Sequence, residues 1–415
     1  MSFFRNPPHS LKNLEICLWF TANQQSEEVL AFFEALNSLA RIISLKLAFH
    51  PPFVRNQPPF LDSLYSSLFT SLQSLSQLET LQLRFPYFPC IENKHIQHLA
   101  STLQCLKNLK RLLINPPFLQ SPNEGLISLG QSLQHLTNFS TLDLDIANSF
   151  SHQSMQIFSH SIAHLNPTNL TLDFNIFAGS VPRPTSTIKR IFRKLVNLWK
   201  KNSLSPFFSD LQNFTLLSTL TLHLSSLDIS AQDLKSLCLA SQKFQNLSFL
   251  HLNLPQFHSA KNLKRLQKLL SCLKDLPKLN RLDLCLHGER EIGILFPHLA
   301  SFLSLRTLSL SFTNAAPLKN GSLYLLLLGI RSLLKLKSLY LFFERQNPGQ
   351  ATFGEKAVFD FLQGLAGLKE LTEFYFLYKK YSMYTHTRSL LPPNLESIKN
   401  LRNLTYFLVD NFRYI

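Results

Sequence analysis

Apolar residues recur along this chain in a ladder whose steps are 3, 4, 3, 3, 3 and 2 residues. One copy consists of Tyr65, Leu68, Leu72, Leu75, Leu78, Leu81 and Leu83. The first four positions of a copy share one face of an α-helix, and the last step is the alternation of a β-strand. The ladder occurs twelve times. The pattern therefore predicts a repeating unit in which a helix is followed by a strand.

Thirteen strands are predicted, and they are spaced by about 33 residues on average. Their first inward residues are Leu14, Leu45, Leu81, Leu112, Leu142, Leu172, Leu220, Leu250, Leu282, Leu308, Leu339, Phe374 and Phe407. The distance from ladder start to strand is 16 residues in eleven of twelve units, and 17 in the unit from Met155 to Leu172. The segment from strand to next helix varies from 10 to 32 residues. We expect stacked units with a packed helix-to-strand half and variable loops at the opposite rim.

The repeated core resembles the leucine-rich-repeat family. Two clear copies of it are Leu136-Thr-Asn-Phe-Ser-Thr-Leu142-Asp-Leu144-Asp-Ile146-Ala-Asn148 and Leu305-Arg-Thr-Leu308-Ser-Leu310-Ser-Phe312-Thr-Asn314. The long period and helical half are similar to the ribonuclease-inhibitor-like subclass. The resemblance implies a curved horseshoe with parallel strands on the concave side and helices on the convex side. It also implies protein binding through the concave face or the rim loops. The buried Asn of the family is clear only at Asn148 and Asn314.

The expected fold class is therefore α/β, a leucine-rich-repeat solenoid of about thirteen repeats. We expect residues 1–415 to form a single domain, with an inserted basic loop or helix at about 177–203. Hydrophobic residues make up 45% of the chain and charged residues 16%, which is typical of a folded protein. The longest apolar run, Leu323 to Ile330, is too short to span a bilayer. The beginning of the chain does not resemble a signal peptide, and the six cysteines form no CxxC pair, so a cytoplasmic or nuclear location is expected.

The residues between the inward positions of each strand are candidates for a binding face. Asp143, Asp145 and Asp173 are expected to form one acidic patch, and His223 and His251 to lie on neighbouring strands. A metal or acid–base site at these residues would need converging ligands and exclusion of water, which an open sheet face does not favour. We therefore interpret them as a solvated contact surface.

An aromatic group follows on the same predicted face. Its members are Tyr340, Phe342 and Tyr375. Aromatic side chains on the polar side of a sheet are candidate anchors of a protein interface. The alternative is that they pack beneath a neighbouring loop such as the segment 378–384.

The net charge of +16 is concentrated in two stretches, 183–201 and 261–281. The first lies in the longest loop and predicts a basic amphipathic helix. Its candidate contacts for an anionic partner are Lys189, Arg190, Arg193, Lys194, Trp199, Lys200 and Lys201. Such a helix suits an acidic protein surface, nucleic acid or membrane headgroups, or it docks its apolar face on its own repeats. The second stretch overlaps a repeat helix, so its charges are expected on the outer face.

The chain contains none of the motifs GxxxxGK[ST], GxGxxG, HExxH or GxSxG. We therefore expect no enzymatic activity, no cofactor and no metal site. The expected function is a protein–protein interaction scaffold that uses the concave face and the rim loops. The alternative is an RNA-binding protein or ribonucleoprotein accessory subunit that uses the two basic stretches.

Overall fold

The structure is a computed structural model in which strands alternate with helices. It describes residues 11–19, 26–50, 61–85, 92–115, 122–146, 151–174, 204–225, 227, 229–255, 260–287, 289–312, 320–345, 355–380 and 406–410. The chain divides into two compact units. The first comprises Met1–Leu217 with Ser226–Ser236, and the second comprises Ser218–Ser225 with Leu237–Ile415.

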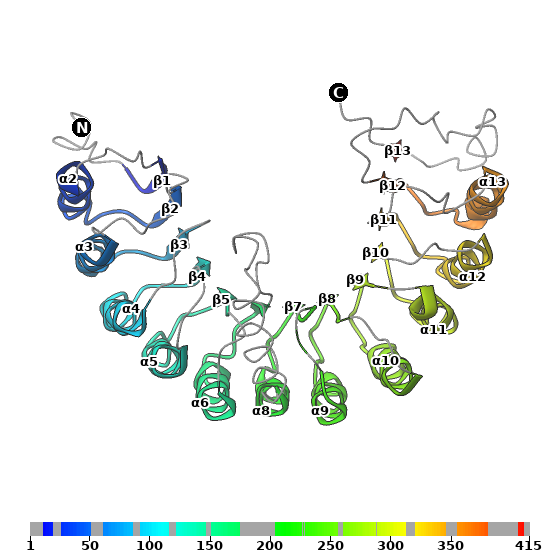
Figure 1. The fold of residues 1–415 in the computed structure, drawn as a ribbon, viewed down its shortest axis with the longest axis horizontal. Helices are drawn as coiled ribbons and strands as arrows, with labels where there is room; N and C mark the ends of the chain where they lie inside the picture. The colour runs from blue at the N-terminus through cyan, green and yellow to red at the C-terminus, as the bar shows by residue number, and fades with distance from the viewer. Residues whose placement is uncertain are drawn as a thin grey trace, which may run out of the picture. The chain divides into compact units, whose positions relative to one another are not determined.

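The first unit carries six described strands, which form one layer, and helices that form the other (Figure 1). In chain order its elements are β1 (Asn13–Trp19), α2 (Ser26–Leu36), β2 (Ser44–His50), α3 (Leu61–Gln73), β3 (Thr80–Arg84), α4 (Asn93–Cys105), β4 (Arg111–Asn115), α5 (Pro122–Leu133), β5 (Thr141–Asp145), α6 (His152–Ala163), β6 (Asn169–Asp173), α8 (Ser205–Asp210) and η1 (Leu211–Asn213).

The second unit repeats the same alternation of strand and helix. Its elements are β7 (Thr219–His223), α9 (Ala231–Ser241, whose first part belongs to the first unit), β8 (Phe249–Asn253), α10 (Ala260–Leu273), β9 (Arg281–Leu286), α11 (Glu289–Leu299), β10 (Thr307–Phe312), α12 (Asn320–Ile330), β11 (Ser338–Arg345), α13 (Glu355–Gly364), η2 (Leu365–Gly367), β12 (Glu373–Lys380) and β13 (Tyr406–Asp410).

The strands of each unit pair in parallel and in chain order, β1 to β6 in the first unit and β7 to β13 in the second. Equivalent ladder residues lie opposite one another, as Leu81 does with Leu112 and Leu112 with Leu142. The expected α/β repeat of parallel strands and helices, of the leucine-rich-repeat type, is therefore confirmed. That residues 1–415 form a single domain remains a prediction.

The ladder positions form the core of both units. In the copy that starts at Tyr65, every ladder side chain is at most 1% exposed. Ser241, where the ladder has no apolar residue, is also fully buried, and its hydroxyl donates to the Cys238 carbonyl in the same helix. The hydroxyl is thus satisfied locally, so the polar residue costs little in the core. The other polar ladder residue, Asn394, lies outside the described residues.

Successive repeats are also joined by a recurring backbone contact just before each strand. The carbonyl of Lys110 accepts hydrogen bonds from the amides of both Ser140 and Thr141. The Ser140 carbonyl then accepts from Thr168 and Asn169 in the next repeat. This contact recurs from β2 through β6 and from β8 through β12, and it satisfies the backbone amides at the start of each strand.

The predicted register of β6 is wrong by two residues. The residue opposite Leu142 is Leu170, and Leu172 lies opposite Leu144. The unit that starts at Met155 is therefore one residue shorter than the others rather than one longer. The shortened turn contains Asn166, the one residue other than glycine with a positive φ among the described residues, at 46°.

Several sequence predictions fall on positions outside the described residues. They are the family-type Asn148 and Asn314 and the insertion at 177–203. Within the part of the chain that the structure describes, every helix is too short or too polar to cross a bilayer.

Candidate functional site

Alternate residues of each strand leave the core and form an exposed sheet face. In the second unit, His251 of β8 lies opposite Asp283 of β9, and Asp283 lies opposite Ser309 of β10. Ser309 lies opposite Tyr340 of β11, and Tyr340 opposite Tyr375 of β12. We call these five residues the central row. It contains three of the sequence-predicted residues, His251, Tyr340 and Tyr375.

One end of the central row is charged and closely bonded. Asp283, which is 7% exposed, accepts from Arg281 Nε at 3.3 Å and from Arg281 Nη2 at 3.0 Å. His251 Nδ1 lies 3.8 Å from Asp283 Oδ2. Burial opposes ionisation of Asp283, but the neighbouring His251 and Arg281 lower its pKa below the ordinary value. Asp283 is therefore ionised at neutral pH, and it holds both basic groups in place.

Two aromatic contacts further order this charged end. The Arg281 guanidinium lies 4.5 Å from the centre of the Phe249 ring, in a cation–π contact. The rings of His223 and His251 have centres 4.9 Å apart. The two histidines that the sequence placed on neighbouring strands are therefore in contact. Arg281 and Phe249 precede the central row by two residues on their strands, and the sequence analysis did not select them as site residues.

The other end of the central row is aromatic. The rings of Tyr340 and Tyr375 stack with centres 4.6 Å apart and planes inclined by 20°. The Tyr340 hydroxyl donates to Glu373 Oε2 at 2.6 Å. Burial, together with Glu373, raises the pKa of Tyr340 to about 12, so this hydroxyl keeps its proton at neutral pH. Phe342 lies beside the pair on β11, opposite Leu377.

Both tyrosines and Phe342 are half-buried, so part of each ring is open on the sheet face. The alternative prediction, that these rings pack beneath segment 378–384, concerns side chains outside the described ones.

The three predicted aspartates lie on the sheet face of the first unit. Asp145 lies opposite Asp173, whereas Asp143 lies opposite Thr171, because of the register of β6. Burial raises the pKa of Asp145 to about 8, and repulsion from Asp173 and Asp143 adds to the effect. Burial also raises the pKa of Asp143, while Arg84 acts in the opposite direction. Burial and mutual repulsion therefore keep Asp145 largely protonated at neutral pH.

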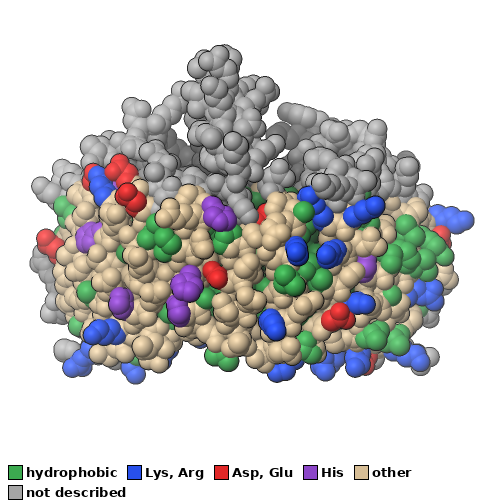
Figure 2. All heavy atoms as spheres, turned by 90° about the horizontal axis from the view of Figure 1, so that it is seen from below, with side chains coloured by type: hydrophobic (Ala, Val, Ile, Leu, Met, Phe, Trp, Pro, Cys, Tyr) green, Lys and Arg blue, Asp and Glu red, His purple; other side chains and the backbone are tan. Residues whose placement is uncertain are grey.

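The two basic stretches differ in what the structure describes. Residues 183–201 lie outside the described residues. In α10 the expected core residues Leu266, Leu269 and Leu273 are buried, and so is Leu276 just after the helix. Lys264, Lys268, Lys274 and Lys278 in and after this helix are exposed, and the helix side of the second unit is rich in Lys and Arg (Figure 2).

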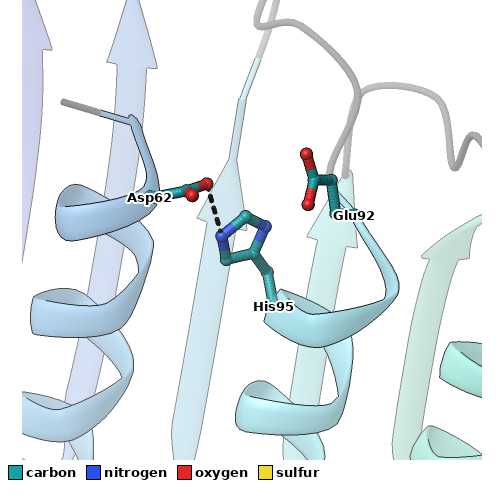
Figure 3. A group of neighbouring side chains, drawn as sticks. All are labelled: Asp62, Glu92 and His95. Atoms are coloured by element: carbon teal, nitrogen blue, oxygen red, sulfur yellow. Dashed lines mark ion pairs between the residues drawn. The ribbon is translucent and has the colours of Figure 1, made fainter. Parts of the chain in front are cut away.

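A further cluster, which the sequence analysis missed, lies where α3 and α4 begin. His95 Nε2 is 3.0 Å from Asp62 Oδ1, and one ligand-capable atom from each of Asp62, Glu92 and His95 lies within 4.8 Å of the others. Figure 3 shows the His95 ring between the two carboxylates. Lys94 Nζ contacts both acids, at 2.5 Å from Asp62 and 3.1 Å from Glu92.

The spacing of this cluster contains a weak sequence signal. Asp62 and His95 are 33 residues apart, which is close to the mean spacing of the repeat and two residues more than the local spacing from Leu81 to Leu112. Polar residues one period apart at helix starts are expected to lie side by side in a stacked repeat protein. The signal is weak because the strand-to-helix segments vary in length.

Comparison with known proteins gives a remote structural likeness. No protein-family model matches the chain, and no curated protein matches its sequence. A chain in the crystal structure of the Rad7 and Elc1 complex in yeast is similar, with a TM-score of 0.43 and 13% sequence identity. The match covers 78% of this chain and 75% of that chain.

Proposed function

We propose that this protein is a non-enzymatic interaction scaffold that binds a protein partner through the exposed sheet face of its second unit. The observation that carries this proposal is the stacked pair of Tyr340 and Tyr375, which stands half-exposed on the polar side of the sheet. Tyrosine is enriched among the residues that dominate protein interfaces, because it offers a large contact area with few rotatable bonds.

The aromatic pair is already ordered, which reduces the entropic cost of binding. Stacking restrains both rings, and the bond to Glu373 restrains the Tyr340 hydroxyl. Binding therefore costs less conformational entropy at these side chains than it would at a flexible surface. Phe342 extends the apolar area along β11.

The charged end of the central row adds specificity. Arg281 and Asp283 lie two strands before Tyr340, which is about 10 Å at the usual strand spacing. We infer that the partner places an apolar side chain on the tyrosines and a polar or charged group against Arg281. Fixed charges of this kind reject partners with the wrong sign at that position.

We also assign the architecture to the ribonuclease-inhibitor-like subclass of leucine-rich repeats and place the protein in the cytoplasm or nucleus. A helix of ten residues or more in most described repeats supports the subclass. Free thiols support a reducing compartment, and those of Cys17, Cys105, Cys238 and Cys272 are among the described residues.

The test is capture of partners from a native lysate, with halves treated or untreated with nuclease and washed across a salt series. We expect a defined protein to survive both treatments and to be lost with the double variant Tyr340→Ala, Tyr375→Ala. The matched control is Tyr324→Ala, because Tyr324 is 60% exposed on α12 of the same unit. Equal capture by the double variant and the control would refute the aromatic site.

RNA binding is a second candidate, favoured by the exposed lysines of α10. Lys264 and Lys268 lie one helical turn apart, and neither makes an ion pair with a described acidic side chain. If both contact phosphates of a single strand, Lys264→Gln with Lys268→Gln should reduce the slope of log affinity against log salt by about 1.4. The measurement is fluorescence anisotropy with a poly(U) probe, and an unchanged slope would exclude this helix as an RNA contact.

A further inference from the structure

The cluster at the starts of α3 and α4 contains a buried histidine whose ring nitrogens lack hydrogen-bond partners. His95 is 4% exposed, and neither Nδ1 nor Nε2 makes an aligned hydrogen bond. Leaving a buried polar group unsatisfied costs about 1–3 kcal/mol. Such a group in a native fold is satisfied by an ordered water, a ligand or an ion.

Packing fixes the direction of this histidine. Its ring centre lies 4.9 Å from that of Tyr65, a core residue of α3. Nε2 then lies 3.0 Å from Asp62 Oδ1, without the alignment of a hydrogen bond. Two ligands of a tetrahedral zinc ion, with bonds of about 2.0–2.1 Å, are separated by about 3.3 Å. The Asp62–His95 separation is therefore near that of two zinc ligands.

The side chains of the cluster are also of the kinds that bind zinc. One imidazole nitrogen of His95 and one carboxylate oxygen from each of Asp62 and Glu92 lie within 4.8 Å of one another. Imidazole and carboxylate groups are ligands that zinc accepts.

We propose that Asp62, Glu92 and His95 form a divalent metal site, with zinc as the favoured ion and water completing its coordination. Glu92 is the N-cap residue of α4, and its side chain makes no capping hydrogen bond, so its carboxylate is available to turn toward the ion. The site bridges two neighbouring helices, and bound metal therefore stabilises the stacking of these two repeats.

Lys94 occupies the place of the cation when metal is absent. Its ammonium group contacts both carboxylates and is itself exposed. Metal binding must displace the Lys94 ammonium group. The bound cation is also repelled by the positive N-terminal ends of the α3 and α4 dipoles. We therefore expect zinc to bind more weakly here than at a typical structural zinc site, and removal of Lys94 should strengthen binding.

The experiment is titration of the full-length, chelator-treated protein with zinc chloride alone, followed by isothermal calorimetry and thermal unfolding. We expect one site that is absent in His95→Gln and weakened about tenfold or more in Asp62→Asn, with a smaller loss in Glu92→Gln. Lys94→Met should bind several-fold tighter than wild type. His98→Gln, three residues along the same helix, is the matched control and should bind as wild type does.

Comparison between variants removes the background of zinc held by cysteines elsewhere, because all variants share it. Asp62 and Lys94 are exposed, so their substitutions keep the test valid if His95→Gln does not fold. Equal zinc affinity in wild type, Asp62→Asn and Lys94→Met would overturn the proposal and leave the cluster as an ion-pair network.

Discussion

The Tyr340 hydroxyl donates a hydrogen bond of 2.6 Å to the Glu373 carboxylate, from β11 to the neighbouring strand β12. Glu373 lies two residues before Tyr375, the residue opposite Tyr340 in the register of the two strands. The hydrogen bond joins the aromatic end of the central row to the first residue of β12. It therefore connects the proposed binding surface with the stability of the two repeats that carry it.

Tyr340→Phe removes this bond and keeps the ring. We expect the free energy of unfolding at pH 7 to fall by about 1 kcal/mol, the usual worth of one such bond. The pKa of Tyr340 is raised from 10.0 to about 12 in the folded state, so the hydroxyl makes its full contribution to the free energy of unfolding below pH 10. This contribution is lost as pH rises from 10 through 12, because only the unfolded tyrosine ionises between these values.

The measurement is urea unfolding of wild type and Tyr340→Phe at pH 7 and pH 11. The difference between them should shrink at pH 11, whereas Tyr324→Phe should match wild type at both. A difference that is independent of pH would show that the hydroxyl is not held in its protonated form.

Asp145 gives a second dependence on pH. Burial, with repulsion from Asp173 and Asp143, raises its pKa from 3.8 to about 8 in the folded state. The Asp145 carboxyl ionises near pH 4 in the unfolded chain and near pH 8 in the folded protein. The free energy of unfolding therefore falls as pH rises from 4 to 8. Asp145→Asn removes this loss. We expect it to match wild type at pH 4 and to be more stable by at least about 1 kcal/mol at pH 8.5, the worth of one pKa unit.

The check is thermal or urea unfolding of both proteins at the two pH values. Asp143→Asn is the matched comparison, and it should gain less because Arg84 stabilises the ionised form of Asp143. An Asp145→Asn variant with no gain at pH 8.5 would mean that the carboxylate is well solvated or well paired.

Sequence periodicity predicted the strands and core because each helix-to-strand half has nearly constant length. It failed at β6 because Leu170 and Leu172 both fit an alternating pattern, and only pairing with β5 selects Leu170. A shift of two keeps the same side chains facing the core, so the local pattern contains no sign of the error.

The candidate site was predictable to a similar degree. Alternation along the strands identified His251, Tyr340 and Tyr375 as members of one face. The partners Arg281 and Glu373 depend on side-chain conformations that reach across strands, which periodicity does not describe. The cluster around His95 lies where loop length varies, so spacing alone does not align its members.

Glycine at the interface of α11 and α12 gives a third prediction. A Cβ on Gly329 would lie 2.8 Å from the Phe296 carbonyl oxygen, whereas one on Gly293 in α11 would meet nothing within 4 Å. Gly329→Ala must therefore separate two helices and should destabilise the protein by about 1–3 kcal/mol. Gly293→Ala should be neutral or stabilise by up to about 1 kcal/mol, because alanine favours helix. Urea unfolding separates these outcomes, and equal effects would show that the helices are not in close contact at Gly329.

Asn166 allows the shortened repeat before β6 to close. Its φ is 46°, its Nδ2 donates to Thr215 Oγ1 at 2.9 Å, and its Oδ1 accepts from the Leu216 amide at 3.1 Å. Asn166→Gly loses both hydrogen bonds and keeps the backbone conformation, which we expect to cost about 1–2 kcal/mol. Asn166→Ala also forces a left-handed conformation on alanine, which adds about 1 kcal/mol.

The order of stability should therefore be wild type, then Asn166→Gly, then Asn166→Ala, as measured by urea unfolding. Asn108 is the matched control, because its Nδ2 donates to the Ser76 carbonyl at 2.9 Å and its φ is not positive. At this position Asn108→Ala should be more stable than Asn108→Gly, since glycine is the more flexible residue in the unfolded chain. If alanine is tolerated better than glycine at both positions, Asn166 contributes through its hydrogen bonds alone and the left-handed backbone is not what the short repeat requires.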